Sequence, residues 1–508
     1  MKGRHMSEQT VQDKHSTLEN ILEQRKEKIR HIREMGMDPF PYSYTVTHKS
    51  CEILKHYDEL EGKNVSVAGR MMAVRRMGKA SFTHLQDAEG RIQLYISESD
   101  IGEKKYELFK ILDIGDIIGI TGTVMKTRTG EITVKADDMT LLCKNIRPLP
   151  IVKEKDGVVY DAFADKELRY RKRYLDLIVN PDVKDIFFKR AAITRATREF
   201  FDEHGYLEVE TPVLQPLYGG ANARPFVTHH NSLDMDLYLR IADELYLKRL
   251  IVGGFDKVYE FSRNFRNEGM DRSHNPEFTA IEFYESYVDY FYMMDFVEKY
   301  FRFIAGRMES MILEYKGEQI DFSKPFARKT MRELFSEHVG IDIASCSEED
   351  FALWCKEHHM EFDPTWNYGQ FLDKLFDEFI EPKLVQPTFV IDYPKAISPL
   401  AKVKRDGDTR FVERFELFIC GSEYVNAFSE LNDPLDQRER LEGQDRLRAL
   451  GDDEAQAFDE DFIQAIETGM PPTGGVGIGF DRLVMLFTGQ TSIKDVLLFP
   501  AMRSEKLS

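Results

Sequence analysis

Arginine, carboxylate and aromatic residues are concentrated in one short stretch, FRNEGMDRSHNPEF at residues 265–278. If a strand runs into this stretch, Asn264, Arg266 and Glu268 share one face, because side chains alternate along a strand. The strand expected after the loop presents a second set on one face, namely Phe278, Ala280, Glu282 and Tyr284. A guanidinium suits phosphate, an aromatic ring suits a base, and carboxylates suit an amine. Taken alone, however, the pattern is more typical of ion pairs on an exposed sheet.

Two further segments carry groups that could work with this stretch. Glu416 and Glu423 stand on either side of a Cys-Gly-Ser turn, and two such carboxylates can hold Mg²⁺ while substrate phosphates complete its shell. Later in the chain, glycines precede Asp481 and Arg482, which indicates a strand-to-helix turn with a second arginine near the helix start. The strand predicted after Glu423 alternates another set on one face, which comprises Asn426, Phe428 and Glu430. A glycine-rich turn alone is weak support, so the inference depends on the three segments occurring together.

The elements that must position these residues fall into two predicted domains. We expect a tail and an amphipathic helix in residues 1–63, with apolar residues at helical spacing over 17–36. Residues 64–147 have the pattern of about five short strands and one helix, which favours an OB-fold β-barrel. Prolines followed by a polar stretch predict a linker over 148–160.

Residues 161–508 are predicted to form the larger domain. A long helix that stops near Gly205 precedes a strand over 207–214, and residues 290–385 look mainly helical. The other predicted strands have unequal and often short connections, which favour a mostly antiparallel sheet flanked by helices over regular βαβ units. With the barrel, the predicted fold class is α+β.

Composition limits the class of protein. The formal net charge of −19 argues against a surface that is positive throughout, although nucleic acid needs only a local basic patch, as near residues 70–79 and 166–173. The five cysteines are odd in number and form no CxxC pair, which argues against a disulfide framework or a zinc site. No apolar run is long enough to span a bilayer, and residues 1–16 lack the apolar core of a secretory signal. We therefore expect a cytoplasmic protein.

Three segments together resemble the signature motifs of class II aminoacyl-tRNA synthetases. They are EHGYLEVETPVL (203–214) for motif 1, FRNEGMDRSHNPEF (265–278) for motif 2 and GVGIGFDR (475–482) for motif 3. The resemblance implies two catalytic arginines, Arg266 on the ATP α-phosphate and the amino-acid carboxylate, and Arg482 on the γ-phosphate. It also implies a homodimer through the motif 1 region, and Mg²⁺ bound by two carboxylates, Glu416 and Glu423. The implied ATP site comprises Arg266, Glu268, His274, Asn275, Phe278, Glu416, Glu423 and Arg482.

Within this class the chain resembles the bacterial-type lysyl-tRNA synthetases. The likeness is carried by GGANARPF (219–226), HNPEFT (274–279) and NAFSELNDPLDQ (426–437), and it extends over nearly the whole chain. It implies ATP-dependent activation of L-lysine to lysyl-adenylate, then transfer to the 3′ end of tRNA(Lys). The implied lysine pocket comprises Gly220, Glu244, Glu282, Tyr284, Asn426, Phe428, Glu430 and Gly477.

The chemistry of lysine supports this pocket independently. A terminal ammonium needs carboxylates at the far end of its site, which Glu244 and Glu282 can supply, whereas an aspartyl enzyme would need cations there. One position departs from the family pattern, because Asp243 stands where proline is expected before Glu244. We predict that the Asp243 side chain caps the helix that follows.

Family members read the anticodon with the barrel, and the resemblance places that site at Arg75, Phe82, Gln93 and Glu131. Phe82 suits stacking on a base, but it suits a core position almost equally well. Two other functions remain open. A binding protein could have lost catalysis, although the intact site residues argue against it, and a ligase that adds lysine to a protein would lack the barrel.

Overall fold

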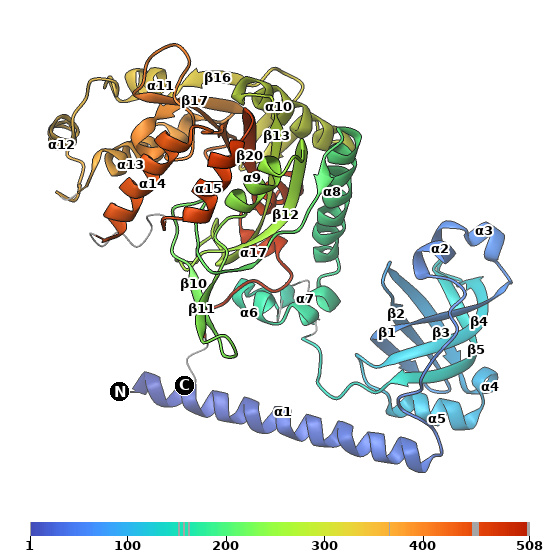
Figure 1. Ribbon diagram of the computed structural model, residues 1–508. Coiled ribbons are helices and arrows are strands. Elements are labelled where there is room, and N and C mark those ends of the chain that lie inside the picture. Colours follow the sequence, from blue (N-terminus) through green and yellow to red (C-terminus); the bar gives the residue numbers. More distant parts are fainter. Residues whose placement is uncertain are drawn as a thin grey trace. The chain divides into compact units, whose positions relative to one another are not determined.

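The chain folds into two compact units, Met1–Ala164 and Asp165–Ser508, each with its own hydrophobic core. Figure 1 shows the computed structural model. It describes residues 2–150, 153–155, 158–160, 163–364, 366–449 and 457–504. Over these ranges, every helix is too short or too polar to cross a membrane.

The first unit contains a closed barrel with the strand order β1-β2-β3-β5-β4. Its strands are β1 (Asn64–Met77), β2 (Ala80–Gln86), β3 (Arg91–Ser97), β4 (Ile117–Lys126) and β5 (Ile132–Cys143). Neighbouring strands are antiparallel except β3 and β5, which run parallel. Alternate side chains point inward, and apolar ones such as Val67, Leu94 and Ile120 are fully buried there. The OB-fold prediction is confirmed.

Short helices and one long helix accompany the barrel. They are α1 (Lys2–Glu34), α2 (Ser50–Lys55), α3 (Tyr57–Leu60), α4 (Glu98–Ile101) and α5 (Glu103–Ile111). Helix α1 begins earlier than the predicted residue 17, and its Ile32 packs into the barrel core. The predicted linker over 148–160 is not wholly irregular, because β6 (Lys153–Lys155) and β7 (Val158–Tyr160) pair as a short hairpin within it.

An eight-stranded sheet forms the centre of the second unit, in the order β16-β17-β18-β19-β20-β13-β12-β8. Its strands are β8 (Leu207–Glu208), β12 (Lys257–Phe265), β13 (Glu277–Ser286), β16 (Ala327–Thr330), β17 (Thr388–Pro394), β18 (Phe411–Phe418), β19 (Glu423–Ser429) and β20 (Thr473–Ile478). Only the two edge pairings, β16 with β17 and β12 with β8, are parallel. The prediction of a mostly antiparallel sheet is therefore confirmed.

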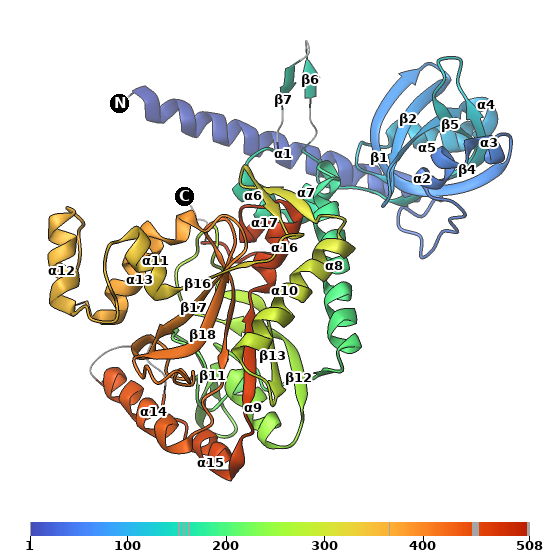
Figure 2. The ribbon, with the colours of Figure 1, turned by 90° about the horizontal axis from the view of Figure 1, so that it is seen from above.

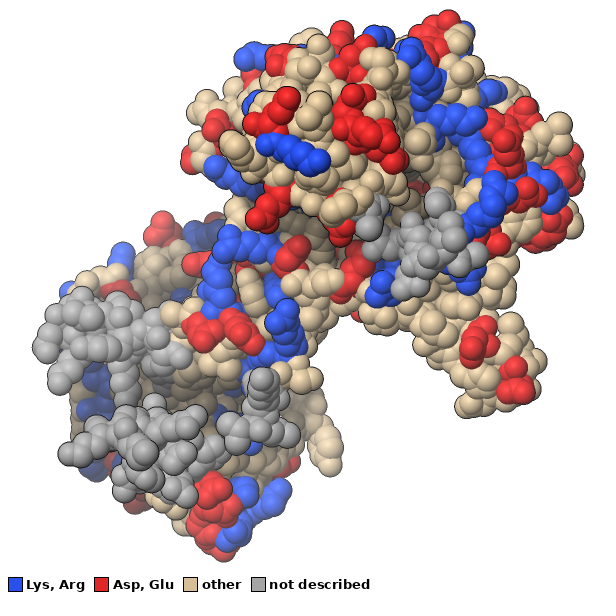
Figure 3. Space-filling model, turned by 90° about the vertical axis from the view of Figure 1, so that its left-hand side faces the viewer, with Lys and Arg blue, Asp and Glu red and all other residues tan. Residues whose placement is uncertain are grey.

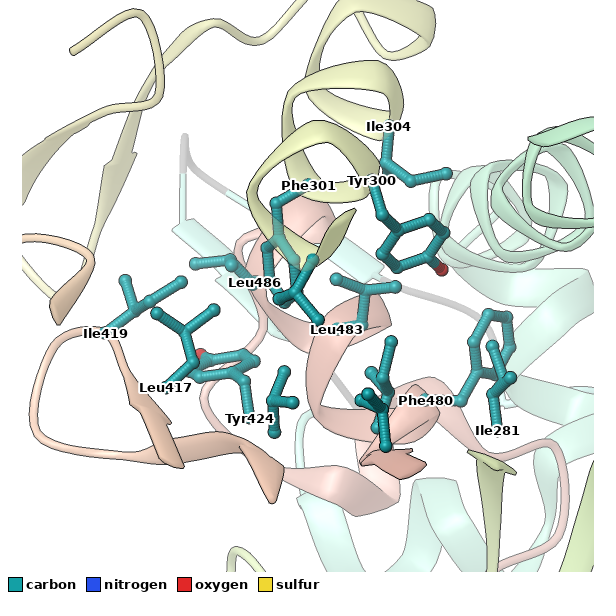
Figure 4. Close-up of a cluster of buried hydrophobic side chains, with 14 of the residues drawn as sticks. Ile281, Tyr300, Phe301, Ile304, Leu417, Ile419, Tyr424, Phe480, Leu483 and Leu486 are labelled. Carbon is teal, nitrogen blue, oxygen red and sulfur yellow. The ribbon is translucent and has the colours of Figure 1, made fainter. Parts of the chain in front are cut away.

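One face of this sheet is covered by α8 (Val183–Glu203), α10 (Tyr290–Arg307) and α16 (Phe480–Thr488). Figure 4 shows Ile281 and Leu417 from the strands gathered with Phe301 and Leu483 from the helices. All four side chains are fully buried. Because strand side chains alternate, the residues next to Ile281 and Leu417 must point to the opposite face of the sheet.

That opposite face carries α9 (Glu244–Val252), which contacts β12 and β13. Helix α15 (Glu460–Gly469) packs against α9, and Figure 2 shows α14 (Pro434–Ala449) beside α15. Apolar residues of these helices form a small separate core with Leu400. Between this layer and the sheet lies the cavity that holds the predicted site.

Two sequence predictions for the second unit need correction. The strand predicted over 207–214 is interrupted and reduces to β8 and β9 (Leu214–Gln215), because Pro212 cannot donate to a ladder. The region 290–385 is not only helical, since three short strands, β14 to β16, lie within it. Its elements besides α10 and β16 are β14 (Ile312–Tyr315), β15 (Glu318–Asp321), α11 (Met331–His338), α12 (Glu348–Glu357), α13 (Tyr368–Phe379) and η1 (Glu381–Lys383).

Smaller elements complete the second unit. Strand β9 pairs with β11, and β11 pairs with β10, in a sheet of their own. The remaining elements are α6 (Lys166–Arg171), α7 (Arg173–Val179), β10 (Phe226–His230), β11 (Met235–Leu239), η2 (Lys395–Ile397) and α17 (Ile493–Val496).

Candidate active site

A cavity of about 470 Å³ opens on the face of the sheet that carries α9. It brings together every site residue predicted for the larger domain, although they come from segments far apart in the sequence. These lining residues are Gly220, Glu244, Arg266, Glu268, His274, Asn275, Phe278, Glu282, Tyr284, Glu416, Glu423, Asn426, Phe428, Glu430, Gly477 and Arg482.

The strand register explains much of this convergence. Asn426 of β19 pairs with Glu416 on one side and with Gly477 of β20 on the other, and Gly477 pairs with Glu282 of β13. These four residues form one row across the sheet. A second row, one step along, comprises Arg414, Phe428, Gly475 and Tyr284. Glycine in both rows of β20 leaves room between the side chains of its two neighbours.

Arg266, just after β12, and Phe278, near the start of β13, lie side by side. The Arg266 backbone N–H donates to the Pro276 carbonyl at 2.9 Å, which continues the ladder just past the end of β12. The guanidinium lies 5.2 Å from the centroid of the Phe278 ring. Burial lowers the pKa of Arg266, although Glu268 acts in the opposite direction. Among the described residues its Nε has no hydrogen-bond partner, so this donor is available to a ligand.

Arg482 connects the third motif to the second. Its Nη1 donates to the Glu423 carbonyl at 2.8 Å and lies 3.5 Å from the Glu423 carboxylate. Its Nη2 is 3.4 Å from Nε2 of His274, whose Nδ1 lies 2.9 Å from the Asp271 carboxylate. The side chain is therefore held at the cavity wall by groups from two other segments.

Glu416 and Glu423 fit a divalent cation by their chemistry. Arg414 donates to Oε1 of Glu416 at 2.6 Å, and the Tyr393 hydroxyl donates to its Oε2 at 2.8 Å. Burial raises the pKa of Glu416 to about 7, with Arg414 opposing and Glu423 adding to the shift. A hard cation between the two carboxylates would relieve this repulsion, and each oxygen keeps a second lone pair for it. Among the described residues, no three metal-binding side chains form a cluster, so phosphate oxygens would have to complete the shell.

Glu244, Glu282 and Glu430, here called the acidic pocket, are all buried. The Lys248 ammonium forms ion pairs with both Glu244 and Glu430. Burial acts to lower the pKa of Lys248, but the two glutamates outweigh it and the net shift is upward. Burial raises the pKa of Glu430 to about 8, with Lys248 opposing. One cation therefore serves several desolvated carboxyl groups, which leaves the pocket short of positive charge.

Gly475 and Tyr284 shape the wall of the acidic pocket. The Tyr284 hydroxyl donates to Oε2 of Glu282 at 3.2 Å. A Cβ at position 475 would lie 1.9 Å from Oε1 of Glu430, so the glutamate side chain would have to shift. Oε1 of Glu430 has no hydrogen-bond partner among the described residues. This oxygen is thus a buried acceptor that a bound ammonium can satisfy.

The barrel presents the second predicted set on its outer face. Phe82 lies outside the barrel core, and its ring centroid is 5.2 Å from that of Tyr95 on β3. Arg75 is the register partner of Phe82 on β1. Gln93 donates to Glu131 at 2.5 Å and accepts from Thr133 at 2.8 Å, which fixes the orientation of its amide. We call Arg75, Phe82, Gln93, Tyr95 and Glu131 the barrel face.

Comparison with known families assigns both units. Residues 165–503 match the tRNA synthetases class II (D, K and N), and residues 65–142 match the OB-fold nucleic acid binding domain. A lysine–tRNA ligase of Porphyromonas gingivalis is 54% identical over 496 residues, which cover 95% of this chain and 86% of the relative. A lysine–tRNA ligase of Moorella thermoacetica is 51% identical over 489 residues, covering 96% of this chain and 98% of the relative.

The chain belongs to the class II lysine–tRNA ligase family. The family assignment applies to both units, because the similarity extends over the barrel as well as the synthetase domain. An aminoacyl-tRNA synthetase of this family needs a site for ATP and an amino acid, and the cavity supplies arginines, an aromatic ring and carboxylates in one place.

Sequence reasoning missed several residues in or near the cavity and on the barrel face of this ligase. Lys248 stands four residues after Glu244, a helical spacing that could have revealed the ion pair. Arg414 precedes Glu416 by two residues, so strand alternation could have placed both on one face. Tyr95 could have been found in the same way, from its alternation with Gln93.

The predicted helix cap at Asp243 is wrong. Helix α9 begins at Glu244, and Asp243 occupies the N-cap position, but its side chain makes no capping hydrogen bond. The carboxyl group is fully buried instead, where burial raises its pKa and Glu260 adds to the shift. The side chain therefore turns away from the helix terminus and toward the neighbouring strands.

Proposed function

We propose that this protein catalyses ATP-dependent activation of L-lysine to lysyl-adenylate and then transfers the lysyl group to the 3′ end of tRNA(Lys). One observation carries the choice of amino acid, namely that the cavity containing Arg266 and Arg482 is also lined by the three buried carboxyl groups of the acidic pocket. Carboxylates attract an ammonium, and they would repel the side chain of aspartate. Lysine is therefore favoured over the other amino acids served by this synthetase class.

The first step needs no protein nucleophile. The lysine carboxylate attacks the α-phosphorus of ATP, and pyrophosphate leaves, so catalysis depends on positioning and on stabilising charge. Arg266 would contact the lysine carboxylate and the α-phosphate, and its free Nε supports that role. Phe278 offers an aromatic face for adenine beside it.

The pyrophosphate end of ATP would be held by other residues of the ATP site. Arg482 would bind the γ-phosphate, with His274 and Glu268 lining the same part of the site. Mg²⁺ would be held by Glu416 and Glu423, and when bound it neutralises charge on the phosphates. Asn275 is fixed by a bond from the Ala501 N–H at 3.2 Å and donates to the Glu277 carbonyl, which keeps the loop in place.

The lysine side chain would end in the acidic pocket. Its ammonium would satisfy Oε1 of Glu430 and approach Glu244 and Glu282, while Phe428 and Gly220 line the path. Leaving buried carboxylates without a cation costs about 3–5 kcal/mol by analogy with a broken buried ion pair. A neutral isostere such as norleucine would then be rejected by a factor on the order of 10⁴.

The barrel face would bind the anticodon of tRNA(Lys). Phe82 and Tyr95 offer neighbouring rings for base stacking, Arg75 a cation, and Gln93 with Glu131 polar atoms for base edges. Figure 3 shows Lys and Arg side chains among acidic ones on the surface it presents, so the net charge of −19 leaves local basic surface. A polyanion can therefore approach an acidic protein.

We also infer that the protein acts in the cytoplasm as a homodimer that joins through the motif 1 region. Around motif 1, the side chains of Leu207, Val213, Leu214 and Leu217 are exposed although they are apolar. Several exposed apolar side chains within one short segment are typical of a surface that another chain covers.

ATP–pyrophosphate exchange with each standard amino acid, in Mg²⁺ and without tRNA, tests the proposal. Exchange with lysine alone is the expected result, and charging of tRNA(Lys) in a second assay would identify the acceptor. Exchange with aspartate or asparagine would overturn the lysine assignment. Exchange with no amino acid would overturn the activity itself.

A further inference from the structure

Asp243 lies behind the acidic pocket, where it has neither a capping role nor a cation of its own. The residue is fully buried, and neither carboxyl oxygen accepts a hydrogen bond of good geometry from the described residues. A buried ionised carboxylate without donors is strongly unfavourable. Some other group must therefore compensate it, or it must keep a proton.

The nearby cations are already engaged. Arg240 donates to Glu260 at 2.6 Å and to the Arg263 carbonyl at 3.0 Å. Lys248 is bound between Glu244 and Glu430. Neither of these cations makes an ion pair with Asp243 in the described structure.

The group that does face Asp243 is another acid, Glu282 of the acidic pocket. The two carboxyl groups are within hydrogen-bonding reach, and such a bond forms only if one of them carries a proton. Burial raises the pKa of Glu282 well above its usual range, and Asp243 and Glu244 add to the shift. The other groups around the pair are Ser262 and Glu260 on β12, Tyr284 on β13, Glu244 and Lys248 on α9, Arg240, Arg266 and Glu430.

We propose that Asp243 and Glu282 share one proton, and that Asp243 thereby sets the pH range in which the acidic pocket accepts an ammonium group. This inference rests on the proposed lysine site. Two buried carboxyl groups in contact cannot both ionise readily, so one proton stays with the pair at neutral pH. The remaining negative charge can be delocalised over both residues and presented to the substrate through Glu282. Asp243 is thus a positioning residue that acts through Glu282 and does not line the cavity.

The direction of the pH effect follows from charge. As the pH falls through the apparent pKa of the pair, a second proton binds and the pocket loses its negative charge there. Lysine binding weakens in consequence, so the KM for lysine rises by up to about tenfold per pH unit, while kcat changes little. The titration belongs to the pair as a whole and is not assigned to one residue.

Asp243→Asn tests the proposal in the full-length protein. The amide can donate to Glu282 but cannot share a proton with it, so the negatively charged, singly protonated state loses the stabilisation that the pair gives it and Glu282 ionises less readily. We expect the midpoint of the KM profile for lysine, from ATP–pyrophosphate exchange, to lie about one pH unit higher than in the wild type. Asp243→Pro, which installs the residue expected in relatives, should also remove the wild-type midpoint.

The controls separate the possible failures. Asp256→Asn makes the same chemical change at an exposed carboxylate of the same unit and should keep the wild-type profile. Free lysine and ATP titrate in the same way in every assay, so their titration does not contribute to a difference in midpoint between variants. An unchanged midpoint in a folded Asp243→Asn protein, or a KM that rises equally at every pH, overturns the inference.

A spectroscopic measurement covers the case in which both substitutions prevent folding. Infrared difference spectra of the wild type, recorded on adding lysine at neutral pH, should show a change in the carbonyl stretch of a protonated carboxyl group. No such change would overturn the shared proton. Absence of lysine-dependent exchange in the wild type at every pH would instead overturn the proposed function, so the two failures are distinguishable.

Discussion

The acidic pocket and the barrel face recognise their expected ligands by different physical means. In the pocket, Glu244, Glu282 and Glu430 are buried, and Lys248 provides one cation for two of them. On the barrel face, Phe82 and Gln93 remain partly exposed, and Glu131 is exposed. The pocket recognises its ligand through buried carboxyl groups that need a cation. The barrel face instead offers flat rings and oriented polar groups to a ligand that stays partly hydrated.

This difference affects both selectivity and tolerance. Desolvated charge discriminates strongly, because a ligand without the matching charge leaves the carboxyl groups unpaired. Stacking is weaker and tolerates different bases, so specificity on the barrel face must come from groups with a fixed orientation, such as Gln93. Changes in the pocket should therefore affect lysine activation strongly, and changes on the barrel face should affect only tRNA charging, and less.

Arg266→Ala should have the largest effect. Removing a preorganised donor to a developing charge slows catalysis by about 10²–10³-fold, and the pyrophosphate exchange rate should fall at least that far. Arg263→Ala, at an exposed position of β12 three residues earlier, is the matched control and should exchange at nearly the wild-type rate. Wild-type exchange in a folded Arg266→Ala protein would remove this residue from its proposed role.

Gly475→Ala adds one carbon atom to the wall of the acidic pocket. The new Cβ would overlap Oε1 of Glu430 at 1.9 Å and approach the Tyr284 ring at 2.5 Å. Overpacking of this kind costs about 1–3 kcal/mol, so the KM for lysine should rise roughly 5- to 150-fold. The KM for tRNA should stay the same.

Gly306→Ala controls for loss of a glycine, because its Cβ would meet nothing within 4 Å. An unchanged KM for lysine in a folded Gly475→Ala protein would mean that Glu430 takes no part in lysine binding. Thermal melting of both variants would show whether the central strand β20 has been disturbed.

Phe82→Ala should have the most limited effect of the three, because it changes only the tRNA step. Loss of one stacking ring costs about 1–3 kcal/mol per base, which would raise the KM for tRNA while lysine-dependent exchange stays constant. Tyr42→Ala removes an exposed aromatic residue from the same unit and should leave both quantities unchanged. Equal loss of exchange and charging in Phe82→Ala would indicate a structural residue.

Strand alternation made much of the site predictable from the sequence. The period of two placed Glu282 with Tyr284, and Asn426 with Phe428 and Glu430, on shared faces that the structure shows lining one cavity. The barrel and the mostly antiparallel sheet were also predicted correctly. The strand over 207–214 was predicted wrongly. Local β-propensity favoured a continuous strand, but Pro212 has no backbone N–H to donate to a neighbouring strand, and the segment is interrupted there.

The sequence by itself determined which residue types meet ATP and an amino acid, since alternation and motif spacing are properties of the local chain. Only the tertiary structure decided the charge state of the pocket. Lys248 meets Glu430 across 182 positions of the chain, and Asp243 faces Glu282 and not its own helix. The physical reason is that burial and like-charge proximity arise from packing, and both depend on which distant segments the fold brings into contact.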